Sequence, residues 1–182
     1  LGCAISAHPA LRFFYGTAST ETGKKVMDGA ADALKRVTLE LGGNDAAIVL
    51  ADNDPKEAAP KIFQGAFQNS GQVCIAIKRA YVHESIYDEM CDELAKLAKA
   101  AVVGDGLQQG VNLGPLQNKT QFEKVLGYIE SAKADGKIIA GGARATEKGY
   151  FIQPTIVRDI TDGAKLVDEE QFGPVLPVIK IK

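Results

Sequence analysis

The amino-acid sequence predicts an α/β fold in which a mainly parallel sheet is flanked by helices. Short apolar runs, which suit buried strands, alternate along the chain with longer amphipathic segments, which suit helices. The chain has 182 residues, of which 46% are hydrophobic, and this is enough for one sizeable core or for a core and part of a second domain. It contains no internal repeats, heptads or low-complexity tracts, so nothing points to a repeat protein or a coiled coil.

The first part of the chain is expected to hold three strands and two helices. Ser19 and Thr20 offer hydroxyl groups that can cap the first helix, and Asp52–Pro55 supplies turn and cap residues for the second. In residues 37–41 apolar and polar residues alternate, which places Glu40 on the face opposite the three apolar side chains. The expected strands are 11–15, which we expect to be buried, 37–41 and 46–51, and the expected helices run to about residues 34 and 69.

The rest of the chain continues the alternation and ends in an apolar run. Residues 84–101 and 119–134 are expected to form amphipathic helices, and Cys91 lies beside the apolar stripe of the first, so we expect it to pack in the core. Residues 104–114 are rich in turn formers and predict a loop. The expected strands are 73–82, the pair 138–139 and 150–152 on either side of Gly141-Gly142, and 177–182.

Composition and charge exclude several classes of function. A net charge of −2 gives no electrostatic reason to bind nucleic acid or an anionic membrane. No apolar run approaches the ~20 residues that a bilayer span needs. The three cysteines, Cys3, Cys74 and Cys91, show no metal-ligand spacing, and there are only two histidines. We therefore expect neither a disulfide framework nor a metal site, and we expect a reducing, cytoplasmic compartment.

The two ends of the sequence predict a fragment of a longer protein. The chain begins at Leu1 instead of a methionine and runs directly into apolar sequence. It stops within residues 177–182, which look like an uncompleted strand. A targeting peptide of the longer protein would lie outside this chain.

Cys74 is the first candidate for chemistry. It follows a Ser-Gly pair at the point where a helical pattern stops and a strand pattern begins. Gly71 can adopt backbone angles that other residues avoid, so the chain can turn sharply there and present Cys74 at the edge of an element. A lone cysteine is more often a small buried hydrophobe, so this assignment needs support from the rest of the sequence.

Four motifs supply that support, and they occur in the order Ser19-Thr20-Glu21-Thr22-Gly23, Leu39-Glu40-Leu41-Gly42-Gly43-Asn44, Gly71-Gln72-Val73-Cys74 and Glu169-Glu170-Gln171-Phe172-Gly173-Pro174-Val175. Three shorter segments give weaker support for the same interpretation, and they are His8-Pro9, Gly114-Pro115-Leu116 and Gln153-Pro154-Thr155-Ile156. With these motifs the chain resembles the middle and catalytic part of an NAD(P)-dependent aldehyde dehydrogenase over essentially its whole length. The resemblance implies that residues 1–41 are the C-terminal remnant of a Rossmann-like dinucleotide-binding domain. It implies that residues 42–182 are a catalytic domain truncated at its C-terminus.

The resemblance implies oxidation of an aldehyde to a carboxylic acid with NAD or NADP. Cys74 matches the family nucleophile, and a thiolate suits this role because it attacks carbonyl carbons readily and later leaves well from a thioester. The backbone N–H of Cys74 is an expected donor to the oxyanion that forms on attack. Glu40 matches the residue that activates the water which hydrolyses the thioester; the alternative is a glutamate on the solvent face of a strand.

Ser19, Thr20 and Gly23 match the family's pyrophosphate site, where a helix N-terminus favours an anion. The alternative is ordinary helix capping, which needs only one hydroxyl group. The sequence departs from the family just before this motif. Counted without a gap from His8-Pro9, the family's motif glycine falls on Ala18, whose Cβ would limit close approach of a phosphate; alternatively Gly16 is the motif glycine and is followed by a two-residue insertion.

Glu170 matches the family glutamate that binds the hydroxyl groups of the nicotinamide ribose, and Phe172 matches the ring that packs near the nicotinamide. Leu41 is expected to contribute its backbone near the nicotinamide. The alternative is a polar loop with one buried aromatic residue. A second departure follows the nucleophile, where many relatives have small residues and this chain has bulkier ones at Ile77 and Lys78.

Other functions remain as alternatives. In a CoA-acylating semialdehyde dehydrogenase CoA would resolve the thioester, but relatives of that type lack the counterpart of Glu40. A cysteine hydrolase would need a histidine partner, for which His8 and His83 are the only candidates. A non-catalytic structural relative is the third alternative. The resemblance also implies that the isolated fragment is inactive and that the longer protein is a homo-oligomer, a dimer or tetramer.

Overall fold

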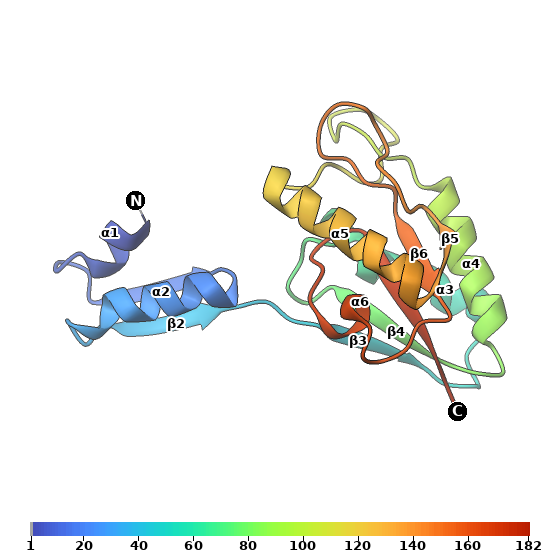
Figure 1. Cartoon of the computed structure of the whole chain (residues 1–182), viewed down its shortest axis with the longest axis horizontal. Helices are drawn as coiled ribbons and strands as arrows, with labels where there is room; N and C mark the ends of the chain where they lie inside the picture. Colours follow the sequence, from blue (N-terminus) through green and yellow to red (C-terminus); the bar gives the residue numbers. More distant parts are fainter. Residues whose placement is uncertain (1) are drawn as a thin grey trace. The chain divides into compact units, whose positions relative to one another are not determined.

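The computed structural model describes residues 2–182, except for the side chain of residue 3. It confirms the predicted α/β class, with mainly parallel sheets flanked by helices. The contacts within the chain divide it into two compact units, Leu1–Gly43 and Asn44–Lys182. Each unit is described by itself (Figure 1).

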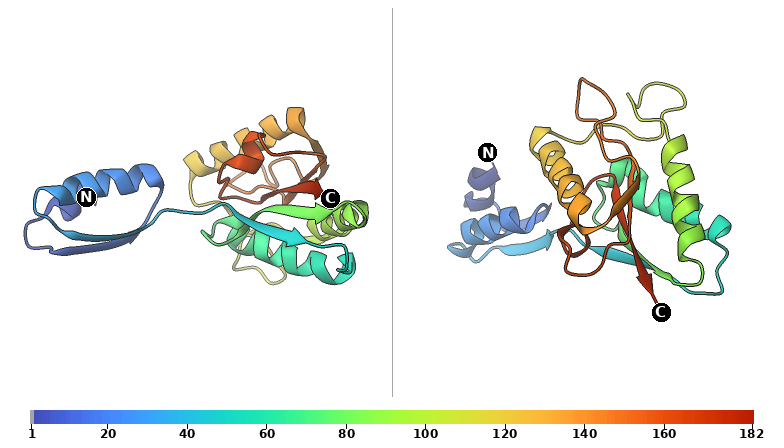
Figure 2. Two further views of the ribbon diagram at one scale, coloured as in Figure 1. Left: turned by 90° about the horizontal axis from the view of Figure 1, so that it is seen from below. Right: turned by 45° about the vertical axis from the view of Figure 1, so that its right-hand side comes forward.

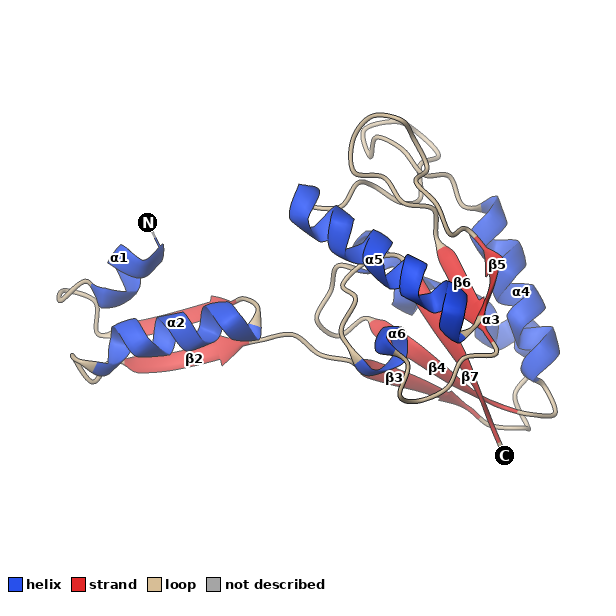
Figure 3. Cartoon of the chain, viewed as in Figure 1, coloured by secondary structure: helices blue, strands red, loops and turns tan. Residues whose placement is uncertain are grey.

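The first unit is a short helix followed by a strand–helix–strand motif. Its elements are α1 (Gly2–Ala7), β1 (Phe13–Thr17), α2 (Thr20–Ala31) and β2 (Arg36–Glu40). The two strands are parallel and paired without a break from Phe13 opposite Arg36 to Thr17 opposite Glu40. Helix α2 connects them and lies along one face of the pair (Figure 3), so the carboxyl ends of both strands lie at the same edge as the start of α2.

Burial in this unit matches one prediction and contradicts another. Along β2 the half-buried and exposed residues alternate as predicted, and Glu40 is on the exposed side. The first strand, however, is not buried: Phe13 is 55% exposed and Tyr15 is 62% exposed. A two-stranded sheet with a helix on one face leaves its other face uncovered, so apolar strand residues there stay accessible.

The second unit is built on a five-stranded sheet with the order β3-β4-β7-β6-β5. All neighbouring strands are parallel except β5 and β6, which are antiparallel. The strands are β3 (Asp45–Val49), β4 (Ile77–His83), β5 (Lys137–Ala140), β6 (Thr155–Arg158) and β7 (Val175–Ile181). The helices are α3 (Pro55–Phe67), the 3₁₀ turn η1 (Gln68–Gly71), α4 (Tyr87–Ala100), α5 (Lys119–Asp135) and α6 (Lys165–Asp168).

Helices cover both faces of this sheet (Figure 2). One hydrophobic cluster joins α3 and α4 to the sheet, and a second joins α5 and α6 to it. The central strand β7 contributes to both clusters, because Leu176 and Val178 belong to the first and Val175 and Ile179 to the second. This period of two in a strand that is apolar on both sides is typical of a buried parallel strand.

Most expected elements begin or end a few residues from their predicted boundaries, and three of them differ as follows. The strand expected at 73–82 begins only at Ile77, because the preceding residues turn around the Cys74 region. The second strand expected at 150–152 is Thr155–Arg158, and Ile152 makes only an isolated bridge to Arg144. The helix expected from residue 84 begins at Tyr87. The burial of Cys91 in that helix is confirmed, with an exposed fraction of 0%.

Candidate active site

Cys74 lies in a turn between η1 and β4, and its side chain is exposed. Three successive residues before it, Asn69, Ser70 and Gly71, have φ values of 50°, 56° and 74°. This strained backbone ends the helix and turns the chain sharply. A Cβ atom on Gly71 would lie 2.4 Å from the carbonyl oxygen of Gly173, so only glycine lets the Cys74 turn pack against the loop that contains Gly173.

Side chains around this turn anchor it to the loop at residues 114–117. The Ser70 hydroxyl donates to the Gly114 carbonyl at 2.9 Å. The Gln72 amide donates to the Pro115 carbonyl at 3.3 Å, and its oxygen accepts from the Gln117 backbone N–H at 2.8 Å. These bonds hold the segment that contains Gly114-Pro115-Leu116 beside the Cys74 turn.

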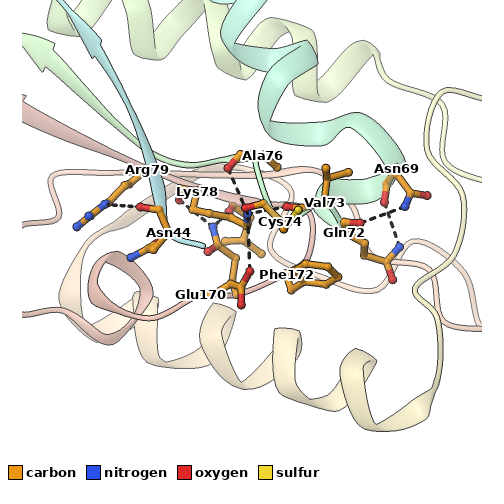
Figure 4. Close-up of polar contacts among 12 residues, drawn as sticks. Asn44, Asn69, Gln72, Val73, Cys74, Ala76, Lys78, Arg79, Glu170 and Phe172 are labelled. Atoms are coloured by element: carbon orange, nitrogen blue, oxygen red, sulfur yellow. Dashed lines mark hydrogen bonds and ion pairs between the residues drawn. The ribbon is translucent and has the colours of Figure 1, made fainter. Parts of the chain in front are cut away.

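The cation under the Cys74 turn is Lys78. Its side chain is 1% exposed, and its ammonium group donates to the carbonyl oxygens of Val73 at 2.7 Å, Cys74 at 3.1 Å and Ala76 at 3.2 Å (Figure 4). Burial lowers the pKa of Lys78 from its ordinary value, and the negative charge of Glu170 opposes this shift. The turn that presents Cys74 is therefore built around a buried positive charge.

Glu170 and Phe172 lie beside the same cation. A carboxylate oxygen of Glu170 is 4.0 Å from the Lys78 ammonium nitrogen, and the Glu170 side chain is 28% exposed. The centre of the Phe172 ring is 5.8 Å from that nitrogen. Figure 4 shows Cys74, Glu170 and Phe172 gathered around Lys78. The structure therefore brings together three of the residues predicted from sequence.

Two glutamine side chains fix the loop that carries Glu170 and Phe172. The buried Gln171 amide donates to the carbonyl oxygens of Lys78 at 2.8 Å and Val175 at 2.6 Å. From α5, the Gln121 amide donates to the carbonyl oxygens of Gln171 and Phe172, both at 2.9 Å. Phe172 itself has a φ of 50°, a left-handed conformation that the bond from Gln121 to its carbonyl helps to hold in place.

The remaining predicted residues lie together in the first unit. Ser19 is the N-cap of α2 and accepts from the Thr22 backbone N–H at 3.3 Å, and Thr20 is the first residue of the helix. A Cβ atom on Gly23 would lie 2.6 Å from the Leu41 side chain, so α2 packs closely on Leu41. Glu40 is the exposed last residue of β2.

Gly16 and Ala18, the two candidates for the motif glycine, occupy different places in the structure. Gly16 lies inside β1, in a register that continues to Thr17 without a bulge. The Ala18 backbone N–H then donates to the Glu40 carbonyl at 2.9 Å and extends the pairing by one residue. Ala18 is therefore the residue at the turn into α2, where a Cβ restricts the approach of a ligand.

Sequence reasoning missed a role for Lys78, Gln121 and Gln171. Lys78 was singled out only as a departure from small residues, and a lysine in the middle of an apolar strand pattern is the one signal that could have marked it as buried and paired. Gln121 lies on α5, far from the motif in sequence, so its contacts follow from the fold alone.

A cysteine–histidine pair is not formed within the second unit. His83 is the last residue of β4 and its ring bonds to Ser85 at 2.8 Å, whereas Cys74 precedes the first residue of the strand. A strand of seven residues spans roughly 20 Å. This separation counts against the cysteine hydrolase alternative for His83.

Among the residues that the structure describes, no helix is long and apolar enough to cross a membrane. The same part of the chain contains no group of three or more His, Cys, Asp or Glu side chains that could hold a metal ion.

Iodoacetamide should alkylate Cys74 faster than Cys91 in the folded full-length protein. Cys74 is exposed, whereas Cys91 is buried and burial raises the pKa of its thiol to about 11. Because the thiolate is the reactive form, Cys91 stays protected near neutral pH. Peptide mass spectrometry after timed exposure measures both rates, and equal rates in the folded protein would contradict this expectation. We also expect Cys3 to react more slowly than Cys74, but the side chain of Cys3 lies outside the described residues.

The raised pKa of Cys91 also gives a pH dependence of stability. The pKa is higher in the folded state than its ordinary value of ~8.5, so the folded protein holds this proton more tightly. The contribution of Cys91 to stability is therefore complete below pH ~8.5 and is lost as the pH rises toward about 11.

The control for the alkylation experiment is the denatured protein, in which Cys74 and Cys91 should react with iodoacetamide at similar rates.

Comparisons with known proteins match the whole chain. A family model described as "Aldehyde dehydrogenase family" matches residues 1–182. The chain is 46% identical over 183 aligned positions to a mitochondrial aldehyde dehydrogenase of Leishmania tarentolae and 44% identical to cytosolic aldehyde dehydrogenase 1 of Mus musculus. The alignments include 100% of this chain but only 37% and 36% of the lengths of these two relatives. A solved NAD+ complex of aldehyde dehydrogenase from Bacillus cereus is similar over 100% of this chain and 37% of that one, with 44% identity and a TM-score of 0.95.

Proposed function

The chain belongs to the aldehyde dehydrogenase family, and on this premise we propose that the longer protein oxidises an aldehyde to a carboxylic acid with NAD or NADP. The observation that carries the proposal is the exposed Cys74 in a turn held beside Glu170 and Phe172. The chain spans little more than a third of the length of the relatives that it matches. The activity is therefore proposed for the full-length protein.

We propose that the two compact units have different roles in the reaction. We assign residues 1–41 to the end of a dinucleotide-binding domain and residues 42–182 to the catalytic domain. The parallel strand–helix–strand of the first unit supports the first assignment, since a helix N-terminus after a parallel strand is a common site for a pyrophosphate. The Cys74 turn and the Glu170 loop support the second.

The reaction begins at Cys74. Its thiolate attacks the carbonyl carbon of the aldehyde and forms a C–S bond, and the carbonyl oxygen becomes an oxyanion. The backbone N–H of Cys74 is a suitable donor to that oxyanion, because none of the backbone hydrogen bonds of the described loop residues uses it. Collapse of the oxyanion would then pass the hydride to the acceptor that a bound nicotinamide supplies, and this leaves a thioester on Cys74.

The residues present fit a bound dinucleotide. Ser19, Thr20 and Gly23 surround the start of α2, where the first backbone N–H groups of a helix lack intrahelical partners. The partly exposed Glu170 carboxylate can accept from ribose hydroxyl groups, and the Phe172 ring offers an apolar wall. The nicotinamide ring supplies the hydride acceptor when it is bound. Leu41, packed on Gly23, contributes backbone near that ring.

Glu40 activates the water that hydrolyses the thioester. A carboxylate at the exposed end of β2 can accept the proton of that water and so completes the release of the acid. The presence of this carboxylate favours hydrolysis over transfer of the acyl group to CoA. Consumption of CoA during turnover of the full-length protein would indicate the CoA-acylating alternative.

The direct test is reduction of NAD or NADP by the full-length protein with a panel of aldehydes. We expect aldehyde-dependent cofactor reduction with formation of the acid, and none from the isolated 182-residue chain. The absence of turnover in the full-length protein would leave the non-catalytic alternative. Activity of the isolated chain would refute the expectation that this 182-residue chain is inactive by itself.

Assembly and compartment are further parts of the proposal. We propose that the full-length protein is a homo-oligomer, a dimer or a tetramer, and that it is cytoplasmic. Relatives carry both cytosolic and mitochondrial names, so fractionation of cells tests the compartment. Light scattering of the purified full-length protein tests the assembly.

A further inference from the structure

Lys78 is a buried cation, and removing its ammonium group from water costs free energy. Its side chain is 1% exposed, and an ammonium group removed from water needs full pairing to be tolerated. Its three N–H donors match the three carbonyl oxygens within 2.7 to 3.2 Å. All three carbonyls belong to the turn that presents Cys74. A site with this much polar complementarity is built for a cation.

We propose that Lys78 is a positioning residue that fixes the Cys74 turn and the Glu170 carboxylate relative to each other, so that one buried cation sets both the nucleophile and the ribose-binding group. This inference rests on the proposed function, because it assigns Glu170 to the cofactor and Cys74 to the aldehyde.

The first half of the argument concerns the turn. The carbonyl of Cys74 is held by the ammonium group at 3.1 Å, between the carbonyls of Val73 at 2.7 Å and Ala76 at 3.2 Å. A peptide plane whose oxygen is held cannot rotate, so the orientation of the planes on both sides of Cys74 is fixed. That orientation directs the thiol and the adjacent N–H, which both act on the aldehyde.

The second half concerns the loop with Glu170. The Glu170 carboxylate is 4.0 Å from the same ammonium nitrogen, and the backbone carbonyl of Lys78 accepts from Gln171 at 2.8 Å. Lys78 therefore holds this loop with its side chain and its backbone. An ion pair of this length limits the directions in which the carboxylate points.

The balance of charges around Lys78 agrees with this role. Desolvation is the largest influence on its pKa and lowers it, while the negative charges of Glu170, Asp45 and the Cys74 thiolate raise it. The protonated form thus depends on the groups that it positions. A methionine side chain, which is similar in size but has no N–H donors, would leave the three carbonyl oxygens without their ammonium partner and would remove the cation 4.0 Å from the Glu170 carboxylate.

The experiment compares Lys78→Met and Lys78→Gln with Lys96→Met in the full-length protein. Lys96 is a matched control because it also forms an ion pair, with Glu93 at 2.6 Å, but on the exposed surface of α4. The readouts are the Kd of NAD+ or NADP+ measured without aldehyde, the rate of Cys74 alkylation, kcat and KM, and the melting temperature. Lys78→Gln retains N–H groups that can donate to the carbonyl oxygens of the turn. If Lys78→Met does not fold, Lys78→Gln alone provides the test of the inference.

Loss of a charged hydrogen-bonding group predicts a Kd for the cofactor roughly 10-fold higher or more in both Lys78 variants. Cys74 alkylation should also change, because the peptide planes that orient the thiol are no longer held by the ammonium group, and Lys96→Met should change neither quantity. Lys78 variants that melt earlier but bind the cofactor and react with iodoacetamide like the wild type would reduce Lys78 to a packing role and overturn the inference.

The same experiment separates this inference from the proposed function. A wild-type protein that neither binds NAD+ or NADP+ nor oxidises any aldehyde refutes the proposed function and, with it, the role of Lys78 toward the cofactor. A wild-type protein that does both, with Lys78 variants that match it, refutes the inference alone.

Discussion

Replacing Cys74 by serine is expected to lower kcat for aldehyde oxidation by at least roughly 10⁴-fold, which is the scale observed when an enzyme loses its nucleophile. A serine hydroxyl group is not ionised near neutral pH and needs an adjacent base to attack a carbonyl. His83 lies at the far end of β4, so it does not supply that base. The measurement is the rate of cofactor reduction by the full-length protein at saturating aldehyde and cofactor.

The Cys74→Ser variant should fold and bind the cofactor like the wild type. The side chain is exposed, and the hydrogen bonds that hold its turn come from the backbone carbonyl groups and from Lys78. Cys91→Ala is the matched control, because it removes the buried thiol of α4 and should retain activity. A Cys74→Ser protein as active as Cys91→Ala would remove the basis of the proposed mechanism.

The local backbone and exposure of several candidate residues could be predicted from sequence because they depend on near neighbours in the chain. Ser19 caps α2 as its hydroxyl group predicts, and the alternation that exposes Glu40 follows from the period of a strand. Gly71 has the positive φ that its place before Cys74 predicts. Each of these features is decided within a few residues along the chain.

The surroundings of Cys74 could not be predicted, because they depend on residues that are distant in sequence. Lys78 interrupts an apolar pattern, and only the fold reveals that its ammonium group lies beneath the Cys74 turn and near Glu170. The strand expected at 73–82 is shorter at its start for the same reason. Backbone that would extend the strand instead closes a turn on the Lys78 side chain.

Replacing Glu40 by glutamine is expected to separate the two halves of the reaction. Glutamine has the shape of glutamate but cannot accept a proton from water, so hydrolysis of the thioester should slow by roughly 10²–10⁴-fold, the usual contribution of a general base. Attack by Cys74 and hydride transfer do not require this base. A rapid first burst of reduced cofactor should therefore remain, followed by slow steady-state turnover.

Rapid-mixing kinetics with the full-length protein measure the burst and the steady state in one experiment. The backbone carbonyl of Glu40 accepts from Ala18 at 2.9 Å, and the substitution leaves this bond in place. Asp32→Asn, which changes an exposed carboxylate beyond the other end of α2, is the control and should keep full turnover.

Addition of hydroxylamine extends the test of Glu40. This nucleophile attacks a thioester without help from a base, so it should accelerate turnover of Glu40→Gln but not of Cys74→Ser, in which no thioester forms. Loss of the burst with cofactor binding intact would mean that Glu40 acts before hydride transfer. In that case the carboxylate at the end of β2 would belong to the activation of Cys74 and not to the release of the acid.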